Sequence, residues 1–186
     1  MMDIQELKAA LKAGKYDATF RKLYPGRWEP QQARYLHIAE EFGKRFGEER
    51  AVELFSAPGR SEIGGNHTDH QQGRVLAAAV TLDAVAVAAK NDQNVICIYS
   101  EGHGEERISL EKLDIVPQEQ GTTAALIRGI AARFYELDLR FGGFDAYVSS
   151  DVLPGSGLSS SAAYGVLVGT ILSGLFNGGK VRQGLG

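Results

Sequence analysis

The segment from Asp151 to Ala163 contains the residue types and spacing best suited to bind an anion. Two glycines, Gly155 and Gly157, precede three consecutive serines and let the backbone approach a ligand closely. The apolar pattern predicts a helix from Leu158, so the serines lie in its first turn, where N–H groups lack partners and the helix dipole favours negative charge. The segment therefore predicts a phosphate-binding loop. Its candidate residues are Pro154, Gly155, Ser156, Gly157, Leu158, Ser159, Ser160 and Ser161.

The same loop offers a metal ligand and also has a simpler interpretation. A serine hydroxyl can ligate the Mg²⁺ that accompanies a nucleotide, and Ser160 is the candidate. The loop lacks the Gly-Lys-Ser/Thr ending of a Walker loop. A serine that caps a helix after a glycine turn is common, but a cap accounts for one serine and not for three. Phosphate binding is the interpretation that uses all three serines.

A second segment, residues 56–70, concentrates polar side chains between two apolar stretches. It contains Arg60, Glu62, Asn66, His67, Asp69 and His70. So many hydrogen-bonding groups are costly to bury unless they meet a polar partner, and sugar hydroxyls both donate and accept. Asp69 can accept from two adjacent hydroxyls, Asn66 can donate and accept, and Arg60 can reach a phosphoryl oxygen. Two alternatives stay open: a solvated loop, and a metal site at His67 to His70, where no further ligand follows at metal spacing.

The elements that must position these segments follow from hydrophobic periodicity. Helical spacing predicts helices over residues 3–13, 30–46, 123–137 and 158–176, the last one apolar nearly all round and therefore buried. Strands are predicted over residues 52–56, 75–80, 84–89, 95–99 and 106–110, and alternation predicts a further strand over residues 144–149. Residues 60–73 read as a polar, glycine-rich loop. The sequence thus predicts one α/β (α+β) domain over residues 1–186, with a mixed sheet and helices on one face.

Composition and charge exclude several classes of partner. The 186 residues carry a formal net charge of -3, so no basic field attracts nucleic acid or anionic lipid. The longest apolar run, residues 76–89, is interrupted by Thr81 and Asp83 and is too short to span a bilayer. The one cysteine, Cys97, rules out an intrachain disulfide and fits a reducing compartment, with its thiol buried. We expect a cytoplasmic protein with no nucleic-acid or membrane partner.

Both segments resemble motifs of one kinase superfamily. Residues 154–163 resemble the nucleotide-binding loop of galactokinase, homoserine kinase, mevalonate kinase and phosphomevalonate kinase, the GHMP kinases. Residues 57–73 resemble the galactokinase signature, which is Gly-Arg followed by Ile-Gly-Glu-His-Thr-Asp-Tyr. The motifs stand in the family's order, and the lead-in before the first is similar too, so the resemblance covers nearly the whole chain. It implies the fold of the GHMP kinase N-terminal domain, with ATP and Mg²⁺ as cofactors.

The resemblance also implies roles for the matching residues. Arg60 would act near the transferred phosphoryl group, and residues 155–161 would cradle the ATP phosphates and Mg²⁺. The sugar hydroxyls would be held by Asn66, His67 and Asp69. Three positions depart from the family pattern: Asn66 and Gly165 stand where relatives carry Glu, and His70 replaces Tyr. Since a neutral amide can also donate, Asn66 leaves open which galactose-like sugar is bound.

The implied activity is ATP-dependent phosphorylation of galactose, or a close relative, at the anomeric hydroxyl. The product would be the sugar 1-phosphate, the first step of galactose catabolism, and the intact protein is expected to be a monomer. The family's aspartate base lies in a Gly-x-x-Asp-Gln motif after the serine loop, and none follows Ser161 here. We therefore expect a truncated, catalytically incomplete N-terminal portion without the C-terminal domain. The alternatives are a non-catalytic sugar- and ATP-binding sensor on the same fold, and an unrelated phosphate-binding module.

Overall fold

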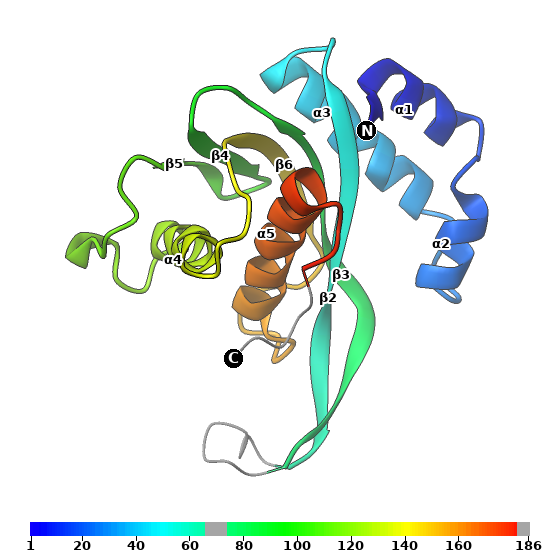
Figure 1. Cartoon of the computed structure of the whole chain (residues 1–186). Coiled ribbons are helices and arrows are strands. Elements are labelled where there is room, and N and C mark those ends of the chain that lie inside the picture. The colour runs from blue at the N-terminus through cyan, green and yellow to red at the C-terminus, as the bar shows by residue number, and fades with distance from the viewer. Residues whose placement is uncertain (66–73, 182–186) are drawn as a thin grey trace.

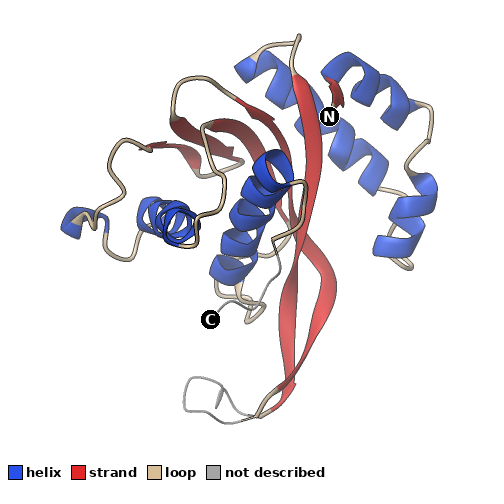
Figure 2. Ribbon diagram, in the orientation of Figure 1, coloured by secondary structure: helices blue, strands red, loops and turns tan. Residues whose placement is uncertain are grey.

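A computed structural model describes residues 1–65 and 74–181, and a mixed sheet forms its centre (Figures 1 and 2). The six strands are β1 (Met2–Asp3), β2 (Ala51–Gly64), β3 (Leu76–Lys90), β4 (Val95–Ser100), β5 (Gly104–Ser109) and β6 (Phe144–Ser150), in the order β1-β2-β3-β6-β4-β5. Strands β4 and β6 are parallel, and the other neighbouring pairs are antiparallel. The predicted mixed α/β sheet is therefore confirmed.

Three N-terminal helices cover one face of the sheet. They are α1 (Ile4–Lys12), α2 (Asp17–Leu23) and α3 (Gln31–Phe46). Asp3 caps α1 by accepting a hydrogen bond from the Gln5 N–H at 2.8 Å, and Gly47 ends α3 at a φ of 106°. The sequence predicted α1 and α3 but not α2, which buries a single residue, Phe20.

The other face of the sheet is covered by α4 (Thr123–Glu136) and α5 (Ser160–Asn177) (Figure 1). The short 3₁₀ helix η2 (Pro117–Glu119) precedes α4. The prediction that helices lie on one face is therefore wrong in this detail. Strand β3 shows the reason, because its residues from Ala84 to Ala89 are all buried. Ala84, Ala86 and Ala88 join the core under α5, whereas the alternate residues join the core under α3, so both faces need cover.

Strands β2 and β3 are longer than the sequence predicted. The two strands expected at residues 75–80 and 84–89 form one strand, and β2 continues through Pro58 as far as Gly64, so residues 60–64 are not loop. Strand β1 pairs with β2 only at Ala51 and Val52, which leaves Pro58 on an edge where proline is tolerated. Residues 76–83 of β3 pair with β2 and not with β6. Residues 58–64 and 76–83 thus form a two-stranded ribbon that projects from the body (Figure 1).

Helix α5 packs along β2 and β3 and also against α4, so the prediction of a buried helix is confirmed except on the side of Val166, which is 40% exposed. A Cβ on Gly174 would lie 2.5 Å from the Phe55 ring, which shows how closely the helix approaches β2. A groove of about 500 Å³ runs beside the helix, and its lining includes Phe55, Phe134 and Val166. Among the described helices α5 is the one whose length and apolar composition would suit a membrane span, but helices that pack on a sheet share these properties.

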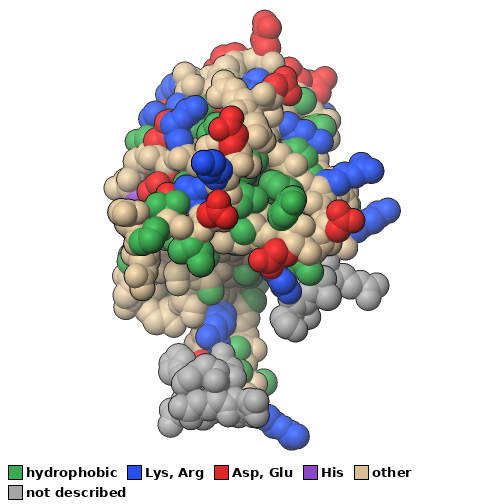
Figure 3. Space-filling view, turned by 60° about the vertical axis from the view of Figure 1, so that its left-hand side comes forward, with side chains coloured by type: hydrophobic (Ala, Val, Ile, Leu, Met, Phe, Trp, Pro, Cys, Tyr) green, Lys and Arg blue, Asp and Glu red, His purple; other side chains and the backbone are tan. Residues whose placement is uncertain are grey.

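One face of the molecule and the cysteine can be compared with the expectations from the sequence. On the face shown in Figure 3, acidic and basic side chains are interspersed around small groups of hydrophobic ones. Cys97 is buried in β4, as predicted, and burial raises the pKa of its thiol to about 11. The thiol is therefore protonated and unreactive at neutral pH.

Candidate functional site

The glycine-serine loop links the end of β6 to the start of α5 in a conformation that needs its glycines. Gly155 and Gly157 both have a φ of 75°, in the left-handed region that glycine adopts without strain. The Ser156 hydroxyl donates to the Leu153 carbonyl at 2.6 Å and closes the turn internally. Residues 153–157 are exposed, so the outer side of the loop faces solvent.

The first turn of α5 presents its backbone N–H groups at the end of this loop. Ser159 is the N-cap residue in a left-handed conformation, with a φ of 58°, and its side chain makes no capping hydrogen bond. Capping of the helix by a serine side chain therefore does not explain why serines stand at this position. The N–H groups of Ser160, Ser161 and Ala162 have no acceptor among the described residues, which is the arrangement that binds anions at helix N-termini.

The loop touches the β2–β3 ribbon, which brings the two sequence motifs together. The Arg60 N–H donates to the Leu158 carbonyl at 3.1 Å. Gly59 lies against the same loop, since a Cβ there would be 3.2 Å from the Leu158 oxygen and from a methyl of Val152. The pairing register between β2 and β3 shifts between Pro58 and Arg60, at the place where this contact is made.

A pocket of about 400 Å³ opens beside the loop, between the start of α5 and the turn after β4. Ser160, Ser161 and Tyr164 line it from α5, and Glu101 lines it from the turn after β4. Burial acts to raise the pKa of Glu101, but hydrogen bonds from Ser149 and His37 outweigh burial and lower it. The Glu101 carboxylate therefore stays ionised, and it disfavours a second anion on its side of the pocket.

The structure describes only some of the site residues that the sequence predicted. Arg60 lies half-buried in β2, and its guanidinium has no hydrogen-bond or ion-pair partner within the described parts of the chain. Asn66, His67 and Asp69, together with His70, lie outside the described residues. Within residues 1–65 and 74–181, no group of three or more His, Cys, Asp or Glu side chains could hold a metal ion.

The sequence did not identify a buried polar cluster that lies where β3 separates from β6. It centres on Asp83, which is 3% exposed and accepts hydrogen bonds from Tyr24, Ser56 and Arg34. The signal was present as a lone carboxylate inside an apolar run, which indicates a buried partner. In the sequence, Asp83 falls between the two strands predicted at residues 75–80 and 84–89.

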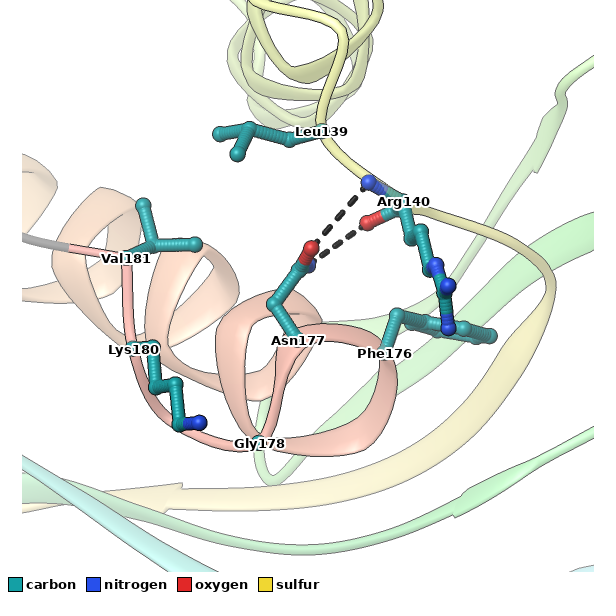
Figure 4. Close-up of a pocket in the computed structure, with 7 residues that line it drawn as sticks. All are labelled: Leu139, Arg140, Phe176, Asn177, Gly178, Lys180 and Val181. Atoms are coloured by element: carbon teal, nitrogen blue, oxygen red, sulfur yellow. Dashed lines mark hydrogen bonds between the residues drawn. The ribbon is translucent and has the colours of Figure 1, made fainter.

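A second pocket of about 400 Å³ lies at the opposite end of α5 and takes no part in this arrangement (Figure 4). The Asn177 side chain crosses it to the Arg140 backbone, donating to the carbonyl at 2.7 Å and accepting from the N–H at 3.1 Å. Because an 18-residue helix is about 27 Å long, this pocket is remote from the serine turn.

Two family descriptions match the chain at these motifs. The galactokinase galactose-binding signature matches residues 40–90, and the N-terminal domain of the GHMP kinases matches residues 125–184. The first range includes Arg60 and the ribbon, and the second includes most of α4 and all of the serine loop and α5.

Curated relatives and solved structures agree with these matches. Galactokinase of Lactococcus lactis strain IL1403 is 32% identical over 145 residues, which cover 75% of this chain and 36% of the relative. Galactokinase of Bacillus subtilis strain 168 is 32% identical over 140 residues, covering 73% and 35%. The crystal structure of Lactococcus lactis galactokinase complexed with galactose has a TM-score of 0.68 at 30% identity, covering 74% of this chain and 36% of that one.

A more distant structure shares the fold alone. Methanococcus jannaschii mevalonate kinase has a TM-score of 0.57 at 19% identity. The chain spans little more than a third of the length of the curated relatives it matches. The signature, the N-terminal domain, the motif order and the fold agree, and the chain belongs to the GHMP kinase family as a galactokinase-related member.

Proposed function

We propose that this chain is the sugar- and ATP-binding domain of a galactokinase-type kinase. The reaction is transfer of the γ-phosphoryl group of ATP to the anomeric hydroxyl of galactose, which gives galactose 1-phosphate and begins galactose catabolism. The observation that carries the proposal is the hydrogen bond from the Arg60 N–H to the Leu158 carbonyl. It joins a strand within the galactose-binding signature to the loop suited to phosphate, which supports adjoining sites for the phosphoryl donor and its acceptor.

The nucleotide is assigned to the serine loop and the pocket beside it. The N–H groups of Ser160 and Ser161, which have no acceptor among the described residues, fit the phosphates, and a pocket of about 400 Å³ is within the usual range for a small-molecule site. Because Glu101 is ionised, the uncharged nucleoside occupies its side of the pocket. Mg²⁺ would be held by the Ser160 hydroxyl together with phosphate oxygens, and when bound it neutralises phosphate charge.

The sugar and the transferred group are assigned to the signature. Asn66, His67 and Asp69 hold the sugar hydroxyls, and the Arg60 guanidinium stabilises charge on the phosphoryl group. No Gly-x-x-Asp-Gln segment follows Ser161 in these 186 residues. A general base contributes about 10²–10⁴-fold to such reactions, so these residues alone are expected to bind both ligands without measurable turnover.

Binding and turnover are measured separately to test the proposal. Calorimetry of the 186-residue chain is expected to detect both Mg-ADP and galactose, and a coupled assay to detect no galactose 1-phosphate. Asp69→Ala should weaken galactose binding at least tenfold, because two hydroxyl contacts worth roughly 1–3 kcal/mol each are lost, and leave Mg-ADP binding intact. Asp92→Ala is the charge-matched control. Absence of galactose and Mg-ADP binding would contradict the proposal.

Phosphorylation itself is measured with a chain of the relatives' full length. Turnover of galactose there supports the kinase. Binding of both ligands without turnover of any hexose would favour the sensor, which the neutral side chain of Asn66 and the absence of a side chain at Gly165 also suit. A Cβ at Gly165 would face Leu126 and Ile130 of α4, so this position directs no carboxylate to the nucleotide.

A further inference from the structure

A buried ion pair lies where the two candidate binding segments diverge from the sheet. Pairing between β3 and β6 ends at Ala84 and Ser150, and the Asp151 N–H then donates to the Asp83 carbonyl at 2.9 Å. Beyond this point β3 continues into the ribbon that carries Arg60 on its partner strand, and the other chain segment becomes the serine loop. The geometry at Asp83 and Asp151 therefore sets the relative placement of ribbon and loop.

The guanidinium of Arg34, from α3, contacts β3, β6 and the residue that follows β6. Its Nη1 lies 2.7 Å from the Asp83 Oδ1 and 3.2 Å from the Asp151 Oδ2. Its Nη2 donates to the Asp83 carbonyl at 3.0 Å and to the Ser149 carbonyl at 3.3 Å. One planar fork thus connects β3, β6 and the first residue of the loop, and a lysine ammonium does not have this geometry.

The cluster is better suited to fixing geometry than to adding stability. The Arg34 side chain is 13% exposed and that of Asp83 is 4% exposed, so desolvation offsets much of their attraction. The Nε of Arg34 is also buried without a partner among the described residues. Asp83 completes its contacts with the hydroxyls of Tyr24 and Ser56, and a carboxylate held by several donors favours one arrangement of the groups around it.

We infer that Arg34 and Asp151 are positioning residues that hold the phosphate loop against the ribbon in the geometry needed for phosphoryl transfer. The role in phosphoryl transfer rests on the proposed function, whereas the contact between Arg34 and Asp151 does not. Asp151 is the informative position for a test, because its side chain is 41% exposed and its replacement leaves the buried Arg34–Asp83 pair intact.

Two substitutions at Asp151 separate positioning from charge. Asp151→Ala removes the acceptor for Arg34, whereas Asp151→Asn keeps an oxygen that accepts the hydrogen bond but removes the charge. On electrostatics alone, both variants should bind an anion more tightly, because a carboxylate beside the phosphate loop is gone. Positioning predicts the opposite for Ala: Mg-ADP binding weaker by about three- to tenfold, with Asn close to wild type. Asp92→Ala, at the far end of β3, controls for charge.

The same variants are compared without ligand by amide hydrogen exchange of peptides that cover residues 151–161. Asp151→Ala is expected to accelerate exchange there, while Asp151→Asn and Asp92→Ala are not. Unchanged exchange in Asp151→Ala, or equally tighter Mg-ADP binding by both Asp151 variants, overturns the inference. A third outcome is faster loop exchange in Asp151→Ala together with no Mg-ADP binding by any protein, wild type included. That outcome supports the structural role of the Arg34 contact and contradicts the proposed function.

Discussion

The hydroxyl oxygens of Tyr24 and Tyr35 lie 2.7 Å apart between the N-terminal helices and the sheet. The Tyr24 hydroxyl also donates to Asp83 at 2.6 Å. Burial is the largest cause that raises the pKa of Tyr35, to about 12. The pKa of Tyr24 is raised as well, first by burial and then by Tyr35 beside it. Neither phenolate is accommodated in this cluster, because it would face the Asp83 carboxylate.

This raised pKa predicts how stability depends on alkaline pH. The native state holds the Tyr35 proton more tightly than the unfolded chain, whose tyrosine pKa is about 10, so the stabilisation is constant below pH 10. It is lost as the pH rises to about 12, and it amounts to roughly 3 kcal/mol for Tyr35. Urea unfolding between pH 8 and pH 12 measures the loss.

The matched variants are Tyr35→Phe and Tyr135→Phe. Tyr35→Phe should show a flatter pH dependence of the unfolding free energy above pH 10, because its titrating group is gone. Tyr135 is 71% exposed, and its replacement should leave the wild-type slope. An unchanged slope in Tyr35→Phe would show that this hydroxyl is not responsible.

At the scale of elements, the contact between β2 and the serine loop depends on Gly59. A Cβ at this position would lie 3.2 Å from the Leu158 carbonyl oxygen and within 3.3 Å of both methyls of Val152. Gly59→Ala is therefore expected to cost about 1–3 kcal/mol of unfolding free energy and to push the loop away from Arg60. Weaker Mg-ADP binding should accompany the loss of stability.

Gly64→Ala provides the control, since it lies in the same strand and no atom of the described residues lies within 4 Å of the added methyl. Urea unfolding and calorimetry on the two variants give the comparison. Equal stability and equal Mg-ADP affinity for both would mean that the close approach at Gly59 has no consequence.

The elements that the sequence predicted well are those with strong local periodicity. Helices α1, α3 and α4 carry apolar residues at helical spacing, β4 is a short apolar run and β6 has an alternating pattern, so their positions follow from local pattern. The long strands were not predicted because Asp83 and Pro58 read locally as breaks. Both are accommodated by tertiary context, Asp83 by Arg34 and Pro58 by its place on an edge.

The candidate site likewise has one part that the local sequence predicts and another part that it does not. The conformation of the glycine-serine loop was predictable, because two glycines before a run of serines and an apolar helix indicate a tight turn into a helix, whereas phosphate binding there stays a prediction. Its contact with Arg60 and the role inferred for Arg34 depend on the order of strands in the sheet, which no local pattern contains. The pocket beside Glu101 was missed for the same reason, since α5, β6 and the turn after β4 all contribute to it.

At the scale of the whole molecule, two hydrophobic cores share one sheet. One core contains Phe42 of α3 and the other contains Ile127 of α4, and alternate residues of β3 belong to each. Because β3 is common to both, the cores should unfold in one cooperative transition. Trp28 packs against the first core and reports on it by fluorescence.

Ile127→Ala gives the sharper test of this cooperativity. It should lower the unfolding free energy by about 2–5 kcal/mol and shift the Trp28 fluorescence midpoint, although the mutation lies in the other core. Ile115→Ala, at a side chain that is 92% exposed, should shift nothing. If the Trp28 transition kept its midpoint while far-UV circular dichroism moved in Ile127→Ala, the cores would be independent.

The order of strands in the sheet also has a consequence for synthesis of the chain. Strand β6 lies between β3 and β4, yet it is the last of the described strands to leave the ribosome. Until residues 144–150 emerge, the edge of β3 from Ala84 to Lys90 has no partner, and residues 91–143 must be made in the meantime. An unpaired apolar edge invites pairing with other chains. The nascent protein therefore has its greatest need of chaperone protection in the interval before the centre of its sheet is filled.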